Sequence, residues 1–173
     1  LRLCLIGIAF LAFAERAFAA DAAPPNVVLI ISDDQAWTDF GFMGHKIVQT
    51  PHIDKLAANS ARFPHGYVPT SVCRPSLVTL LTGLYPHQHG VYFNHPPPGN
   101  GAFNRMSQAE YHRRRDVSHE LIRSVPTLPR LLAKRGYRSF QTGKYWEGHY
   151  RNAGFTDGMT LDKASAEPAF GNR

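Results

Sequence analysis

Apolar and polar positions along residues 26–68 follow the spacing of short strands and helices. Residues 26–31 (NVVLII) form a continuous, mostly β-branched apolar run, which predicts a strand buried on both faces. Thr50 as N-cap and Pro51 at the first helical position predict a helix immediately after them. Residues 61–68 are expected to form a short extended segment before the next helix.

A second helix is predicted where the chain reads TSVCRPSLVTLLTG. Pro75 suits its first turn, Gly83 suits its C-terminal cap, and Cys73 lies immediately before it. Its apolar positions follow the spacing i, i+3, i+4 and i+7 of one helix face, at Leu77, Leu80, Leu81 and Leu84.

The remaining pattern completes an α/β fold. Residues 85–106 are rich in Pro, Gly, Asn and His and predict a long irregular loop. Residues 124–135 predict a helix ended by Gly136, and residues 137–141 predict a strand that runs into Thr142-Gly143-Lys144. The alternation of strands and helices predicts a mostly parallel central sheet with helices on both faces. In such sheets the chemistry gathers at the carboxyl ends of the strands.

Length and composition indicate a globular protein of one ordinary domain. The chain has 173 residues, of which 43% are hydrophobic and 18% charged, and a moderate net charge of +6. Its clearest basic cluster, residues 113–115, is followed at once by Asp116. A solvated face or loop is the main interpretation, and a site for anionic substrate is the alternative. We expect no nucleic-acid partner, because no nucleic-acid-binding signature accompanies the cluster.

The N-terminus has the layout of a secretory signal peptide. An apolar run over residues 3–13 follows Arg2, and Ala17-Phe18-Ala19 supplies a cleavage site. We therefore predict a signal peptide over residues 1–19 and export to the periplasm or the extracellular space; a buried N-terminal helix is the alternative. The run is too short for a stable membrane span.

Removal of the predicted signal peptide would leave one of the two cysteines in the chain. Cys4 lies in the segment predicted to be removed, so Cys73 is the only remaining thiol of the chain. A single cysteine in an exported protein forms an intermolecular bridge, packs as an inert core residue, or serves as a functional group. The start of a helix would favour a reactive, anionic form.

Three further charged positions could carry chemistry. Asp33 and Asp34 follow the predicted strand, where adjacent carboxylates fit either a hard divalent cation or a capped turn. Lys144 follows another predicted strand and fits either an oxyanion-binding point charge or a solvated surface residue.

Four blocks together resemble the N-terminal half of sulfatases, which belong to the alkaline phosphatase superfamily. They are NVVLIISDD at residues 26–34, TPHIDKL at 50–56, TSVCRPSLVTLLTGL at 70–84 and TGK at 142–144. Their order and spacing match the family, and the cysteine block with the upstream Asp pair is the specific part. The resemblance implies an alkaline phosphatase-like α/β fold that is incomplete in this chain.

The resemblance also implies a chemistry. Cys73 would be oxidised to formylglycine by a formylglycine-generating enzyme, and Ca²⁺ would be held by Asp33, Asp34 and the modified residue. Lys144 would bind the sulfate oxygens of a sulfate ester, which includes sulfated polysaccharide as a substrate class. Arg74, next to Cys73, is a further candidate for binding substrate.

Two motifs depart from the family pattern. The family motif runs Cys-x-Pro-Ser-Arg, whereas Leu77 follows Ser76 here, so whether Cys73 is modified is left open. Arg74 lies three residues before Leu77 and is hypothesised to compensate. After Lys144 sulfatases often continue Trp-His, whereas this chain places Trp146 at the histidine position and His149 three residues later.

The length of the chain limits the expected activity. Calcium takes about six to eight oxygen ligands, more than Asp33, Asp34 and Cys73 supply. We therefore expect residues 20–173 to be the N-terminal part of a longer sulfatase domain, inactive alone. Two alternatives stay open: a phosphodiesterase or phosphonate hydrolase of the same superfamily, and a catalytically degenerate binding module.

Overall fold

The described chain divides by its internal contacts into two compact units, and the predicted extent of the sulfatase domain stays a prediction. A computed structural model of the protein describes residues 24–99, 101 and 105–161. Unit 1 comprises Leu1–Gln49 and unit 2 comprises Thr50–Arg173. The predicted signal peptide and Cys4 lie outside the described residues and stay predictions.

The apolar run at residues 26–31 does not form the predicted strand. Its residues have no regular secondary structure and are exposed, with Ile30 at 87%. A parallel strand needs neighbours that complete its ladder of hydrogen bonds, and none of the described residues pairs with this run. The prediction of a buried strand is therefore wrong. The regular element described in unit 1 is a 3₁₀ helix, η1 (Gly41–Met43).

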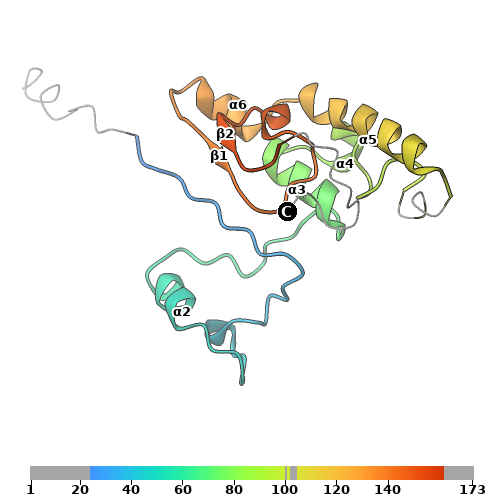
Figure 1. The fold of residues 1–173 in the computed structure, drawn as a ribbon. Coiled ribbons are helices and arrows are strands. Elements are labelled where there is room, and N and C mark those ends of the chain that lie inside the picture. Colours follow the sequence, from blue (N-terminus) through green and yellow to red (C-terminus); the bar gives the residue numbers. More distant parts are fainter. Residues whose placement is uncertain (1–23, 100, 102–104, 162–173) are drawn as a thin grey trace, which may run out of the picture. The chain divides into compact units, whose positions relative to one another are not determined.

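Unit 2 contains helices and a small parallel sheet (Figure 1). Strands β1 (Phe140–Gln141) and β2 (Asp157–Gly158) pair in parallel, with Phe140 opposite Asp157. The helices are α2 (Pro51–Ala58), α3 (Cys73–Thr82), α4 (Pro86–His89), α5 (Gln108–Arg123), α6 (Leu128–Ala133) and η2 (Tyr150–Ala153). The predicted α/β class with parallel pairing is confirmed in an incomplete form.

Helix α3 confirms the prediction in its extent and corrects it in its buried face. The helix ends at Gly83, whose φ of +70° is in the left-handed region that glycine adopts readily. It begins at Cys73 itself rather than after it. Its buried side chains are Arg74, Pro75 and Val78, whereas Leu80 of the expected stripe is 44% exposed. A charged side chain therefore occupies the inner face.

The helices on either side of α3 differ more from expectation. Helix α2 is confirmed with Pro51 in its first turn. Helix α6 begins at Leu128 rather than residue 124, because the Thr127 hydroxyl caps it by accepting from the Arg130 N–H at 3.4 Å. Residues 61–68, expected to be extended, form irregular exposed chain without a strand.

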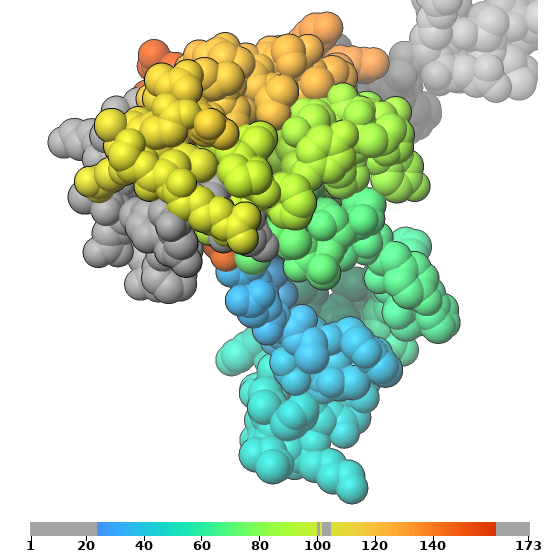
Figure 2. Space-filling view, turned by 90° about the vertical axis from the view of Figure 1, so that its right-hand side faces the viewer, coloured from blue at the N-terminus to red at the C-terminus, as the bar shows by residue number. Residues whose placement is uncertain are grey.

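Helix α5 was not predicted, and it covers an outer surface of unit 2 (Figure 2, yellow to orange). The Ser107 hydroxyl caps its start by accepting from the Glu110 N–H at 3.2 Å. Arg113 and Arg114 are exposed and form ion pairs with Glu110, which confirms a solvated face for two of the three clustered arginines. Arg115 instead turns inward.

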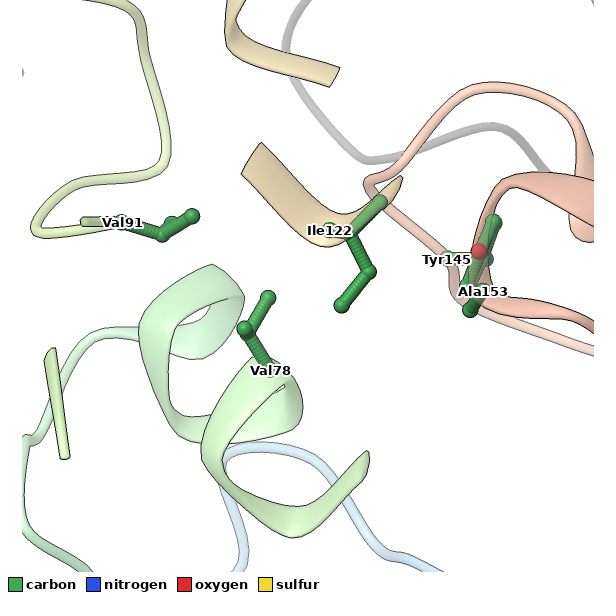
Figure 3. Close-up of a cluster of buried hydrophobic side chains, with 5 residues drawn as sticks. All are labelled: Val78, Val91, Ile122, Tyr145 and Ala153. Carbon is green, nitrogen blue, oxygen red and sulfur yellow. The ribbon is translucent and has the colours of Figure 1, made fainter. Parts of the chain in front are cut away.

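The hydrophobic core of unit 2 joins α3, α5 and the segments around η2. Its buried members are Val78, Val91, Ile122, Tyr145 and Ala153, and Figure 3 shows Val78 of α3 and Ile122 of α5 pointing toward one another. Partly buried side chains such as Leu81 and Leu121 surround them. This core fixes α3, which carries Cys73, against α5.

Truncation of Ile122 is expected to destabilise unit 2 strongly. The Ile122 side chain is fully buried, so Ile122→Ala leaves a cavity and should lower the free energy of unfolding by about 2–5 kcal/mol. Val117, on the same helix and 63% exposed, is the matched control, and Val117→Ala should change it by less than about 0.5 kcal/mol. Urea unfolding measures both, and equal effects would contradict this core.

A buried histidine makes the stability of unit 2 depend on pH. The His119 side chain on α5 is 13% exposed, and its Nε2 atom has no hydrogen-bond partner among the described residues. Burial, followed by the nearby Arg115 charge, lowers the pKa of His119 to about 4. Burial also lowers the pKa values of His89 and His95. Protonation of these rings therefore opposes folding.

We expect the free energy of unfolding to fall as the pH drops from about 6.5 toward 4. Because the folded-state pKa of His119 lies below its usual 6.5, the unfolded chain binds more protons in this range. The contribution of His119 is complete above pH 6.5, and at most about 3 kcal/mol is lost through pH 4. His119→Leu should flatten this dependence in urea unfolding, whereas Val117→Leu should leave it unchanged. Equal slopes in both variants would refute the assignment.

Candidate active site

Cys73 is the first residue of α3, with a half-buried free thiol. The residues after it leave few backbone donors at this helix end. The Arg74 N–H donates to Oδ1 of Asn94 at 2.7 Å, Pro75 has no N–H, and the Ser76 N–H donates to the Val72 carbonyl. The N–H groups of Arg74 and Ser76 are therefore not available to stabilise an anion at Cys73.

Arg74 forms a buried ion pair with Glu147. Its Nε donates to Oε1 of Glu147 at 2.6 Å and its Nη2 to Oε2 at 2.7 Å, a two-point contact between side chains that are each 2% exposed. Ser118 of α5 accepts two further bonds, through its hydroxyl at 3.1 Å and its carbonyl at 3.2 Å. The predicted role of Arg74 in binding substrate stays a prediction, and these contacts do not support it.

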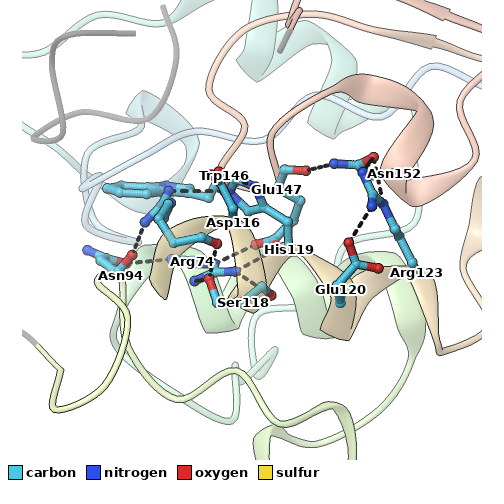
Figure 4. A network of polar contacts seen from close by, with 11 residues as sticks. Arg74, Asn94, Asp116, Ser118, His119, Glu120, Arg123, Trp146, Glu147 and Asn152 are labelled. Atoms are coloured by element: carbon cyan, nitrogen blue, oxygen red, sulfur yellow. Dashed lines mark hydrogen bonds and ion pairs between the residues drawn. The ribbon is translucent and has the colours of Figure 1, made fainter. Parts of the chain in front are cut away.

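The Glu147 segment is itself held by α5 and η2 (Figure 4). The Glu147 carbonyl accepts from the side-chain amide of Asn152 at 2.7 Å. Oδ1 of Asn152 in turn accepts two bonds from Arg123 of α5, at 2.7 and 3.0 Å. Both the side chain and the backbone of Glu147 are therefore fixed within unit 2.

Lys144 lies half-buried after β1, close to an aromatic ring. Its Nζ is 5.5 Å from the ring centroid of Trp146, and the Arg115 guanidinium is 5.1 Å from the same ring. Arg115 also donates to the Trp146 carbonyl at 3.0 Å and to the Asn94 carbonyl. Burial and the neighbouring Arg74 charge lower the pKa of Arg115 to about 10, so it remains a cation at neutral pH.

Trp146 and His149 are the residues considered where this chain departs from the family's Lys-Trp-His pattern, and both lie among other residues of unit 2. Trp146, at the position of the histidine, is buried, and its Nε1 has no hydrogen-bond partner among the described residues. His149 caps η2, because its Nδ1 accepts from the Arg151 N–H at 3.1 Å. The His149 ring also lies against the Tyr150 ring, with their centroids 4.3 Å apart and their planes tilted by 39°.

Asp33 and Asp34 lie in unit 1, in a bend after the apolar run, and both are exposed. Asp34 has a φ of +53°, a left-handed conformation that aspartate tolerates better than most side chains. Adjacent carboxylates of this kind supply the hard oxygen ligands that Ca²⁺ prefers. The ligand set that joins them to Cys73 stays a prediction.

The charged side chains that organise unit 2 around Cys73 were missed by sequence reasoning. Glu147 reads as a solvated acid, and Ser118 and Arg115 fall in a helix whose charged composition hides its buried face. No local sequence pattern pairs Arg74 with Glu147, because the two residues lie 73 positions apart.

Comparison with known proteins identifies relatives of one class. The family model described as Sulfatase matches residues 25–172. Human N-acetylgalactosamine-6-sulfatase is 34% identical over 130 residues, which are 73% of this chain and 22% of the relative. Human arylsulfatase A is 36% identical over 138 residues, 80% of this chain and 24% of the relative. Mouse steryl-sulfatase is 32% identical over 151 residues, 83% of this chain and 22% of the relative.

A solved structure supports the fold. The crystal structure of Ps i-CgsB aligns with a TM-score of 0.58 and 31% identity, over 79% of this chain and 28% of that chain. The chain thus spans 22–24% of the length of these three curated relatives. The α/β class, the family match over residues 25–172 and these identities together show that the chain belongs to the sulfatase family, of which it represents an N-terminal portion.

Proposed function

We propose that the protein hydrolyses sulfate esters, with Cys73 as the position of the catalytic group. The observation that carries this proposal is the placement of Cys73 as the first residue of α3, within a chain of the sulfatase family. Formylglycine at this position, made from Cys73 by a modifying enzyme, would supply a geminal diol as its hydrate. One diol oxygen would attack sulfur and give up its proton, while the S–O bond to the ester's alcohol breaks and the alcohol leaves in protonated form. The alternative is a phosphodiesterase or phosphonate hydrolase of the same superfamily. A comparison of sulfate, phosphate and phosphonate esters as substrates distinguishes the two.

The chain's own residues prepare the site for an anionic ester. Lys144 brings an ammonium group to the segment after β1, and its charge would bind the sulfate oxygens and offset the negative charge that develops during hydrolysis. The half-buried setting beside Trp146 limits the access of water to this charge, which strengthens its effect. The core between α3 and α5 keeps Cys73 on a rigid element.

Calcium fits the carboxylates of unit 1. Asp33 and Asp34 would hold the ion together with the modified Cys73, and the metal would supply charge neutralisation at the ester. These three residues are fewer than the ligands Ca²⁺ takes, so further oxygen ligands are needed from elsewhere in the protein.

We propose a general substrate class, sulfate esters, and a general location outside the cytoplasm. The relatives are named for N-acetylgalactosamine-6-sulfate, aryl sulfate and steryl sulfate, so the proposal stops at sulfate esters, with sulfated polysaccharides and small aryl sulfates as classes to test. We propose export through the N-terminal signal peptide. Within the described part of the chain, no helix is sufficiently long and apolar to cross a bilayer.

Cys73 should carry formylglycine, and its loss should abolish sulfate-ester hydrolysis. Mass spectrometry of the peptide that contains Cys73, from the complete protein co-expressed with a formylglycine-generating enzyme, measures the modified fraction. Cys73→Ala should reduce turnover of 4-nitrophenyl sulfate by at least about 10³-fold, because it removes the attacking group.

The control is Thr82→Ala, at the last position of the same helix, which should leave turnover near that of the wild type. An unmodified Cys73 with full sulfate-ester turnover would contradict the proposal. Faster turnover of 4-nitrophenyl phosphate or a phosphonate ester than of the sulfate would favour the alternative enzyme.

Removal of calcium should inactivate the enzyme reversibly. Treatment with EGTA is expected to abolish hydrolysis of 4-nitrophenyl sulfate, and added Ca²⁺ should restore it. Asp33→Asn should raise the Ca²⁺ concentration for half-maximal activity by about tenfold or more, because one anionic ligand is lost. Asp116→Asn, at an exposed carboxylate of α5, is the matched control. Unchanged Ca²⁺ dependence in Asp33→Asn would remove Asp33 from the ligand set.

A further inference from the structure

The block that contains Cys73 and the block that contains Lys144 are joined by a contact between Arg74 and Glu147. Arg74 occupies the variable position of the cysteine block, and Glu147 lies in the Lys-Tyr-Trp-Glu run that replaces the family's Lys-Trp-His. Their side chains form the two-point ion pair at 2.6 and 2.7 Å, although they are 73 residues apart in sequence. One buried contact therefore links the two blocks of unit 2 that carry Cys73 and Lys144.

The pair belongs to a closed circuit of hydrogen bonds. The Arg74 N–H donates to the Asn94 side chain, and the Asn94 carbonyl accepts from Arg115. Arg115 donates to the carbonyl of Trp146, which precedes Glu147, and Glu147 accepts from the Arg74 side chain. Both the backbone and the side chain of Arg74 are therefore held in one arrangement.

This circuit connects the two segments that carry the proposed chemistry. Arg74 follows Cys73 directly, and Glu147 lies three residues after Lys144. A two-point contact between planar guanidinium and carboxylate groups fixes orientation as well as distance. This contact and the neighbouring bond from Arg115 to the Trp146 carbonyl therefore constrain the segment that directly follows Lys144.

We infer that Glu147 is a positioning residue, which acts through Arg74 to set the placement of Cys73 relative to Lys144. The inference rests on the proposed sulfate-ester hydrolysis. Arg74 then does not replace the motif arginine by direct contact with the attacking group, because its guanidinium is directed to Glu147 and Ser118. It acts through the backbone at the start of α3.

The test compares three variants of the complete protein. Glu147→Gln leaves the buried Arg74 charge without its partner, and Glu147→Asp keeps the charge but shortens the side chain. The double variant Arg74→Met with Glu147→Leu replaces the pair by apolar groups, which often preserves stability. The matched control is Arg138→Gln with Asp157→Asn, which removes an exposed ion pair of 2.8 Å.

Catalysis and stability should separate in the double variant. We expect a melting temperature close to that of the wild type and a kcat for 4-nitrophenyl sulfate, per mole of formylglycine, that is about 10- to 100-fold lower. KM of the double variant should change by less than about threefold. Glu147→Asp, which keeps the carboxylate, should have a kcat between those of the double variant and the wild type. A double variant with wild-type kcat per formylglycine would overturn the inference, since the pair would then be structural only.

Hydrogen exchange gives a measurement that does not depend on the proposed activity. In the double variant, peptides that cover residues 73–76 and 144–148 should exchange faster than in the wild type, and those of the exposed-pair control should not. If the wild type fails to hydrolyse sulfate esters, the proposed function fails, and exchange alone decides whether the pair fixes these segments. Unchanged exchange in the double variant overturns the inference.

Discussion

The buried ion pair between Arg74 and Glu147 is the constraint on which the arrangement of unit 2 depends. Burial of a charge costs several kcal/mol unless a partner and further hydrogen bonds compensate for lost water. Here the compensation needs Ser118 from α5, Glu147 from the segment after β1 and Arg74 from α3 to be in place together. The pair therefore specifies one packing of three elements, whereas an apolar contact would tolerate small shifts.

This pair also sets the electrostatics of its surroundings. Two guanidinium groups, Arg74 and Arg115, share the interior with one carboxylate, so additional positive charge is unfavourable there. The nearby histidines are accordingly held neutral by burial and by these cations. His89 shows how the neutral form is used: its Nδ1 accepts from the Val91 N–H at 3.1 Å, which leaves the proton on Nε2, 3.2 Å from the Thr79 hydroxyl.

Sequence reasoning succeeded where local signals determine structure. Pro51 and Gly83 mark helix ends through their own backbone preferences, and the start of α2 and the end of α3 followed from them. It failed where distant parts of the chain decide. The Arg-rich composition of α5 concealed a helix that buries Tyr111 and Ile122, and no local rule places a guanidinium or a carboxylate in a core. The blocks of the sulfatase family located Cys73, but not the partner of Arg74.

The apolar run at residues 26–31 has a consequence for the handling of this chain. Its side chains face solvent, with Val28 at 81% and Ile30 at 87% exposed, and no described strand pairs with its backbone. A short β-branched segment with few charges and open hydrogen-bonding edges is a template for intermolecular β-sheet. Molecules in which this run stays uncovered are therefore expected to self-associate as their concentration rises.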